Sequence, residues 1–98
     1  GELKDDCGIF GGGTFLVQGT FTVGRGEGST LKFPSSIKEV SRNHAALKQE
    51  GSFMVVTDLG SSNGTLVNDE WIKPNTPIRL QPGDKVCFGK KRYCLTVQ

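Results

Sequence analysis

The apolar residues of this chain are spaced as in β-strands, and no window carries the sustained apolar stripe of an amphipathic helix. The stretches 15–18 and 20–24 are short and enriched in β-branched and aromatic side chains, which favour strands. Similar stretches continue to the end of the chain. The pattern predicts strands over residues 15–18, 20–24, 44–49, 52–59, 65–67, 70–72, 77–80, 85–88 and 92–97.

Turn-forming residues separate the predicted strands. They cluster at residues 50–51, 62–64, 73–75 and 81–84, and include the strong Asn-Gly and Pro-Gly turn pairs. Many short strands joined by closely spaced turns are typical of an antiparallel sandwich or barrel. We therefore predict an all-β fold.

The last two predicted strands form a hairpin whose register can be proposed. If residues 90–91 are a two-residue turn, Phe88 faces Tyr93 and Val86 faces Leu95. All four side chains then lie on one face of the sheet, which is a coherent core pattern.

The same register places two of the three cysteines opposite each other on the other face of the hairpin. These are Cys87 and Cys94, and the third cysteine is Cys7. A disulfide between directly opposed strand positions is conceivable, but such positions are strained hosts for one. An odd cysteine count without regular spacing also argues against a disulfide framework, so we expect free thiols and a reducing, intracellular setting.

Length and composition fit one globular domain over residues 1–98, with 35% hydrophobic and 22% charged residues. The glycines at 11–13 indicate a flexible spacer, so we expect residues 1–13 to be peripheral or less ordered. The formal net charge of +2 is too small to indicate nucleic-acid binding, since proteins that bind a phosphate backbone usually have a dense basic face. A charge of +2 does permit a modest positive pocket for an anion. We expect no nucleic-acid or membrane partner, no cofactor and no metal.

Three polar stretches stand at predicted strand ends, where a rigid scaffold can present side chains to a ligand. They are Gly24-Arg25, the run from Ser41 to His44, and the run from Asp58 to Thr65. In this order and spacing they resemble the signature of the forkhead-associated (FHA) domain family. The resemblance runs from about residue 21 to residue 89, and Ser-Arg-x-His joined to Asp-Leu-Gly-Ser-Ser-Asn-Gly-Thr is highly specific.

The resemblance implies a β-sandwich of eleven strands whose loops at one end bind phosphothreonine peptides. By position, Arg25 and Ser41 would contact the phosphate and Arg42 would lie close to it. Ser62 and Asn63 would hold the peptide, with Asn63 bonded to its backbone.

Five further residues of the motif have expected structural roles. Gly24 permits a turn, His44 braces the binding loop, and Asp58 shapes the loop before Gly64 and Thr65. Taken one at a time, these residues also have simple structural explanations: Arg25 can be an exposed strand-end residue, and Ser41 can cap a turn.

The chemistry of phosphate fits these residue types. A phosphate carries nearly two negative charges at neutral pH and strong acceptor oxygens. A guanidinium offers a fork of donors that stays protonated, and a serine hydroxyl adds a short neutral donor. An asparagine amide has both a donor and an acceptor, so it can pair with a peptide backbone of any sequence.

Glu39, two residues before the motif serine, is a candidate for reading a residue that flanks the phosphothreonine. In some members of the family the side chain at this position faces the peptide. An outward Glu39 would favour a basic peptide residue. The alternative is that Glu39 is simply solvated.

Two other functions stay open on the residues alone. Ser41, His44 and Asp58 include the residue types of a catalytic triad, but the chain has no Gly-x-Ser-x-Gly elbow, so we expect no enzyme. The second alternative is an interaction domain of the same fold that binds proteins without phosphate. In either binding role we expect a monomeric module of a larger signalling protein, in the nucleus or the cytoplasm.

Overall fold

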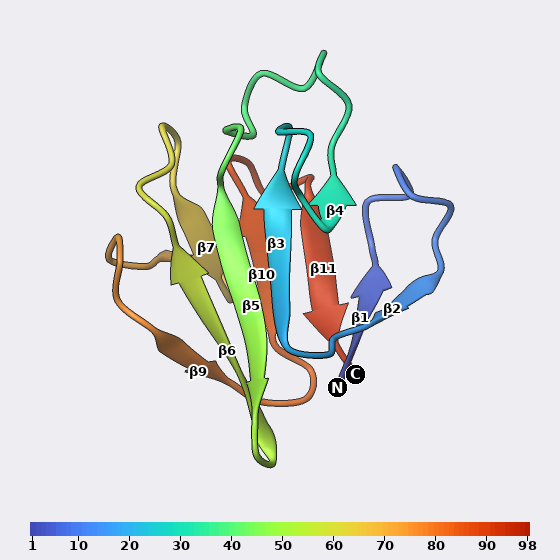
Figure 1. Cartoon of the computed structure of the whole chain (residues 1–98), viewed down its shortest axis with the longest axis vertical. Coiled ribbons are helices and arrows are strands. Elements are labelled where there is room, and N and C mark those ends of the chain that lie inside the picture. The colour runs from blue at the N-terminus through green and yellow to red at the C-terminus, as the bar shows by residue number, and fades with distance from the viewer.

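The computed structural model describes all 98 residues and contains eleven β-strands and no helix (Figure 1). The strands are β1 (Glu2–Asp5), β2 (Thr14–Leu16), β3 (Thr20–Gly24), β4 (Leu31–Lys32), β5 (Ala45–Glu50), β6 (Phe53–Asp58), β7 (Thr65–Val67), β8 (Glu70–Trp71), β9 (Ile78–Leu80), β10 (Lys85–Phe88) and β11 (Cys94–Val97). A six-stranded sheet has the order β2-β1-β11-β10-β7-β8, and a five-stranded sheet has the order β4-β3-β5-β6-β9. The predicted sandwich of about eleven strands is confirmed.

The two sheets bury one shared core because their side chains alternate between the two faces of each strand. In β6, Met54 and Val56 are buried while Phe53 and Val55 are only partly covered. The core cluster contains 17 buried residues drawn from both sheets. The two sheets are therefore the two layers of one sandwich, packed around a single core.

The expectation that residues 1–13 are peripheral does not hold for β1. This strand lies between β2 and β11 in the six-stranded sheet, and Leu3 is fully buried. Asp5 is also buried, and its carboxylate accepts hydrogen bonds from the backbone N–H groups of Cys7, Gly8, Phe10 and Gly12 at 2.8–3.1 Å. The glycine-rich stretch is thus wrapped around a carboxylate and is not a free spacer.

The predicted register of the β10–β11 hairpin is confirmed, although its turn is longer than expected. Val86 pairs with Leu95, and the Phe88 N–H donates to the Tyr93 carbonyl at 2.9 Å. The connection therefore spans residues 89–92, with a turn closed by the Tyr93 N–H and the Lys90 carbonyl at 3.2 Å.

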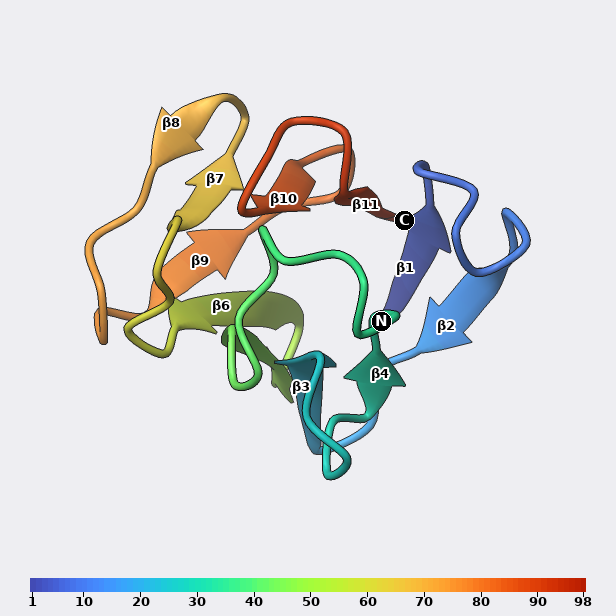
Figure 2. The same ribbon diagram turned by 90° about the horizontal axis from the view of Figure 1, so that it is seen from above.

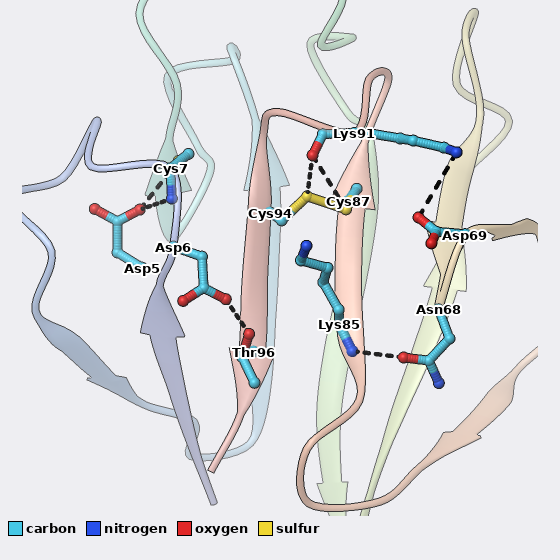
Figure 3. The surroundings of a disulfide bond; sticks show 10 residues. All are labelled: Asp5, Asp6, Cys7, Asn68, Asp69, Lys85, Cys87, Lys91, Cys94 and Thr96. Carbon is cyan, nitrogen blue, oxygen red and sulfur yellow. Dashed lines mark hydrogen bonds and ion pairs between the residues drawn. A yellow bond between two sulfur atoms is a disulfide. The ribbon is translucent and has the colours of Figure 1, made fainter.

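The expectation of free thiols at Cys87 and Cys94 is wrong, because the two residues form a disulfide (Figure 3). They are directly opposed and flanked by the hydrogen-bonded pair of Phe88 and Tyr93, so theirs is a non-hydrogen-bonded pair, in which the two strands approach most closely. Their Cα atoms are 4.0 Å apart. The register predicted from the sequence places the two cysteines opposite each other, and the close approach of the two strands lets their sulfur atoms bond.

The sandwich carries its polar motifs at one end. The β3–β4, β4–β5, β6–β7 and β10–β11 connections lie together there, while both termini and the β5–β6 turn lie at the other end (Figure 1). A small cavity of about 80 Å³ near the termini is lined by residues that include Gln49, Met54 and Val97, far from the motifs. The structure has no helix that is long and apolar enough to cross a membrane.

Candidate functional site

His44 joins two of the clustered loops from beneath. Its Nδ1 accepts a hydrogen bond from the Ser41 N–H at 2.9 Å, and its Nε2 lies 2.8 Å from the Gly64 carbonyl oxygen. Since Nδ1 is an acceptor here, the proton is on Nε2, which donates to Gly64. The ring is fully buried, and burial lowers its pKa below 6.5. His44 is therefore a neutral brace between the β4–β5 and β6–β7 loops.

Asp58, at the end of β6, organises the β6–β7 loop. Its carboxylate is buried and accepts hydrogen bonds from the Gly60 and Ser61 N–H groups at 3.0 and 3.1 Å. The hydroxyls of Ser61 and Thr65 donate to it at 2.6 and 2.7 Å. Burial raises the pKa of this carboxyl, but these donors together outweigh burial and lower its pKa below 3.8. The loop before Thr65 is thus built around one buried charge.

Gly24 allows the β3–β4 loop to lie against the β4–β5 loop. A Cβ atom at this position would stand 2.7 Å from the carbonyl carbon of Arg42 and closer still to its oxygen. The Arg25 N–H donates to the Ser41 carbonyl at 3.1 Å, and the Gly26 N–H donates to the Arg42 carbonyl at 3.0 Å. The absence of a side chain is what brings Arg25 beside Ser41.

The predicted phosphate-binding groups lie along this contact and are reachable from solvent. The Arg25 side chain is partly exposed, and its guanidinium donates to the Val40 and Ser35 carbonyls. Ser41 is partly exposed, and its hydroxyl oxygen accepts from the Ser62 N–H at 2.9 Å, which leaves the hydroxyl proton available to a ligand. The Arg42 side chain is exposed.

The predicted peptide-binding groups lie beside them. Asn63 is exposed, and its amide nitrogen donates to the Glu39 carbonyl at 3.1 Å. This bond orients the amide and leaves its carbonyl oxygen to accept from a ligand. Ser62 is exposed next to it, and its N–H is held by Ser41. The structure thus brings Arg25, Ser41, Ser62 and Asn63 together.

The carboxylate of Glu39 is committed to a partner that the sequence did not indicate. Its Oε2 lies 3.1 Å from the Nζ of Lys90. The pKa of Glu39 is below 4.5, mainly because its carboxylate accepts a hydrogen bond from its own backbone and, second, because of its interaction with Lys90. Lys90 lies in the β10–β11 connection, directly after residue 89, where the match to the family pattern ends. The separation of the two residues along the chain hides their contact from sequence reasoning.

The hairpin is fixed to the site through its glycine. The Gly89 N–H donates to the Gly64 carbonyl at 2.9 Å, the same oxygen that accepts from His44. A Cβ on Gly89 would stand 2.8 Å from the carbonyl carbon of Glu39, at a backbone φ of 80°. All four loops are therefore interlocked.

The family model of the FHA domain matches residues 21–89 of the chain. The oxoglutarate dehydrogenase inhibitor of Corynebacterium efficiens is 45% identical over 83 residues, which is 83% of this chain and 54% of that protein. The chain spans only part of the length of such curated relatives, 54% of this one and 10% of the zeaxanthin epoxidase of Oryza sativa subsp. japonica.

Solved structures agree with this match. The FhaA FHA domain in complex with the intracellular domain of Rv3910 superposes with a TM-score of 0.80 at 28% identity, covering 99% of this chain and 98% of that one. A domain solved in a study of phosphothreonine-dependent FHA domain interactions has a TM-score of 0.79 at 29% identity, covering 97% and 91%.

Proposed function

Because the chain belongs to the FHA domain family, we propose that it is a phosphopeptide-binding module that recognises phosphothreonine in extended segments of partner proteins. The observation that carries the proposal is a single strip reachable from solvent, formed by the partly exposed Arg25 and Ser41 and the exposed Asn63. These donors and acceptors come from three different loops and are held by bonds from beneath. The solved relative named for phosphothreonine-dependent interactions supports the choice of ligand.

Each residue of the strip has a proposed task. Arg25 and Ser41 bind the phosphate oxygens, with Arg42 adding charge from the edge. Asn63 bonds the peptide backbone next to the phosphothreonine, and Ser62 lines the same path. A charge-assisted hydrogen bond contributes about 1.5–3 kcal/mol, so two or three of them favour the phosphorylated over the unphosphorylated peptide by a large factor.

The alternative without phosphate would use a sheet face or another surface. Binding without phosphate does not account for the position of Arg25 beside Ser41, and we therefore propose this alternative second. The titration below separates the two, because only phosphate recognition requires these side chains.

Catalysis by Ser41, His44 and Asp58 is not proposed, on geometric grounds. A triad couples the serine hydroxyl to the histidine ring and the ring to the carboxylate. Here the ring binds the Ser41 backbone N–H and the Gly64 carbonyl, and the Asp58 carboxylate binds other residues of its own loop. The fully buried ring also has no access to a substrate.

The module would recruit phosphorylated proteins as part of a longer signalling protein, in an intracellular setting. Kinases that create phosphothreonine act there, and this is the support for the placement. Free thiols would have favoured a reducing, intracellular setting, but Cys87 and Cys94 form a disulfide, so they no longer support this placement.

The test is a binding titration of phosphothreonine peptides with randomised flanks against phosphoserine and unphosphorylated controls. We expect micromolar affinity, about −8 kcal/mol, for the phosphothreonine peptide alone. Arg25→Ala and Asn63→Ala should each weaken binding about tenfold or more. Arg79→Ala is a matched control, because Arg79 lies on β9 against Phe53, outside the strip.

The result that rejects the proposal is equally clear. Folded protein that binds no phosphopeptide, or that binds the peptide equally well without phosphate, favours the phosphate-independent interface instead.

A further inference from the structure

The β10–β11 hairpin carries three consecutive cations, Lys90, Lys91 and Arg92, at the end of the sandwich that holds the proposed peptide site. All three are exposed. Their only acidic neighbours within ion-pair distance are Glu39, 3.1 Å from Lys90, and Asp69, 3.9 Å from Lys91. Figure 3 shows the pair of Lys91 and Asp69. Three cations thus face two carboxylates, and the hairpin keeps an excess of positive charge.

The hairpin is held at a fixed place relative to the peptide anchor. Asn63 donates to the Glu39 carbonyl, and Gly89 packs against that same carbonyl group. Gly89 also donates to Gly64, the residue after Asn63. Directly below the loop, the Phe88 N–H donates a hydrogen bond to the Tyr93 carbonyl. The Cys87–Cys94 disulfide joins the next pair of residues along the two strands. The cations are therefore carried on a rigid support.

Seen from above, the β4–β5 connection lies between the β3–β4 loop and the β10–β11 hairpin (Figure 2). Arg25 stands on the β3–β4 side of this connection, and Lys90 stands on the other side, next to Glu39. Ser41 bonds the residue before Asn63, Asn63 bonds Glu39, and Glu39 pairs with Lys90. A peptide held by Arg25, Ser41 and Asn63 would therefore extend towards the hairpin if it continued along this line.

The ion pair changes what Glu39 can select. A free Glu39 would attract a basic peptide residue, as its sequence position suggested. With Lys90 on its carboxylate and Arg92 nearby, an incoming lysine would have to displace an existing cation. An incoming carboxylate instead meets cations whose charge is only partly neutralised.

We propose that Lys90, with Lys91 and Arg92 beside it, forms a second subsite that selects an acidic residue flanking the phosphothreonine. This rests on the proposed function, since the phosphate and Asn63 are what deliver the flanking residue to the hairpin. The subsite takes a carboxylate or a second phosphate, and Glu39 partly neutralises Lys90 instead of reading the peptide itself.

The test uses the whole chain and a set of peptides with one phosphothreonine and neutral flanks. Asp, Ala or Lys is placed at each flanking position in turn, and affinities are measured by fluorescence anisotropy. At one or more positions on one side of the phosphothreonine we expect Asp to bind about two- to fivefold more tightly than Ala, and Lys more weakly than Ala. The preference should shrink as salt is raised, because the groups are exposed.

Three variants locate the effect. Lys90→Glu should abolish or reverse the acidic preference while binding of the neutral-flank peptide remains phosphate-dependent. Lys48→Glu makes the same change of charge on β5 in the other sheet and should leave the preference unchanged. Glu39→Gln removes the competing carboxylate, so the acidic preference should persist or grow.

Melting temperatures show whether each variant is folded, and Lys90→Gln provides a milder change if Lys90→Glu is not. Phosphate-dependent binding without charge preference, or with a preference for Lys that Glu39→Gln removes, would overturn the subsite alone. Absence of phosphate-dependent binding to every peptide would overturn the proposed function, and the subsite with it.

Discussion

Acidification should destabilise this fold through His44 before it titrates any carboxylate. His44 is the single histidine of the chain, and its ring is fully buried. Nδ1 accepts from the Ser41 N–H, so a proton added there would set two donors against each other. The folded state therefore holds the ring neutral, and burial lowers its pKa below 6.5.

The sign and size of the effect follow from proton linkage. Above pH 6.5 the ring is neutral in both the folded and the unfolded chain, so the free energy of unfolding is unaffected. Below pH 6.5 the His44 ring binds a proton in the unfolded chain but stays neutral in the folded chain, so the free energy of unfolding decreases as pH falls. The limiting slope for one proton is about 1.4 kcal/mol per pH unit, until the folded pKa is reached.

Urea denaturation at a series of pH values between about 7 and 5 measures this slope, since unperturbed carboxyls titrate below that window. Nitrogen NMR of the single ring reports the tautomer directly, and we expect the neutral form with its proton on Nε2. His44→Phe keeps a buried ring against Phe88 but cannot titrate, so its stability should be lower than wild type and flat over the same window.

A flat profile in the wild type would refute the reasoning, as would the same slope in His44→Phe. A ring protonated on Nδ1, or already cationic at neutral pH, would show that the hydrogen bonds to Ser41 and Gly64 are assigned wrongly.

Three further predictions concern the groups that shape the loops. Gly24→Ala should cost about 1–3 kcal/mol of stability and weaken phosphopeptide binding, while Gly28→Ala, whose Cβ meets nothing within 4 Å, should change neither; equal melting temperatures would contradict this. Asp58→Asn should cost about 1–3 kcal/mol near neutral pH, because it removes the carboxylate that the loop donors stabilise. In the wild type this stabilisation is lost as pH falls below 3.8 towards the lowered pKa of the folded state, and Asp58→Asn should lack this part of the loss. Reducing the Cys87–Cys94 disulfide, which joins residues 7 apart, should cost about 2 kcal/mol and lower the Tm by roughly 10 °C, and a Cys87→Ala, Cys94→Ala variant should show no response to the reductant.

The elements that the sequence reveals are those whose side chains alternate or whose turns carry strong signals. Two strands escape it. β1 has charged residues at three of its four positions, which hides the strand pattern around Leu3. β4 has only two residues and pairs in parallel with β3, so it adds no periodic signal of its own.

The site shows the same division. Its residue types and their spacing could be found in the sequence, because they lie in contiguous motifs. The Glu39–Lys90 ion pair could not, since it joins residues brought together only by the packing of the β10–β11 hairpin. Asp5 is similar: an acidic residue in a strand gives no sign that backbone N–H groups of the following loop will satisfy it.

The design of the binding end separates the residues that contact a ligand from those that hold the loops. The proposed ligand contacts, Arg25 and Asn63, are partly or fully exposed, and much of their bonding is to carbonyl groups of the loops they cross. The loops themselves are fixed by buried groups, His44 and Asp58, whose bonds go to backbone and neighbouring hydroxyls. An exposed contact can therefore change to alter specificity at little cost in stability, whereas a buried brace cannot change without moving every contact above it. From this physical asymmetry we expect substitutions at exposed contacts to change peptide binding with a smaller loss of stability than substitutions at His44 or Asp58.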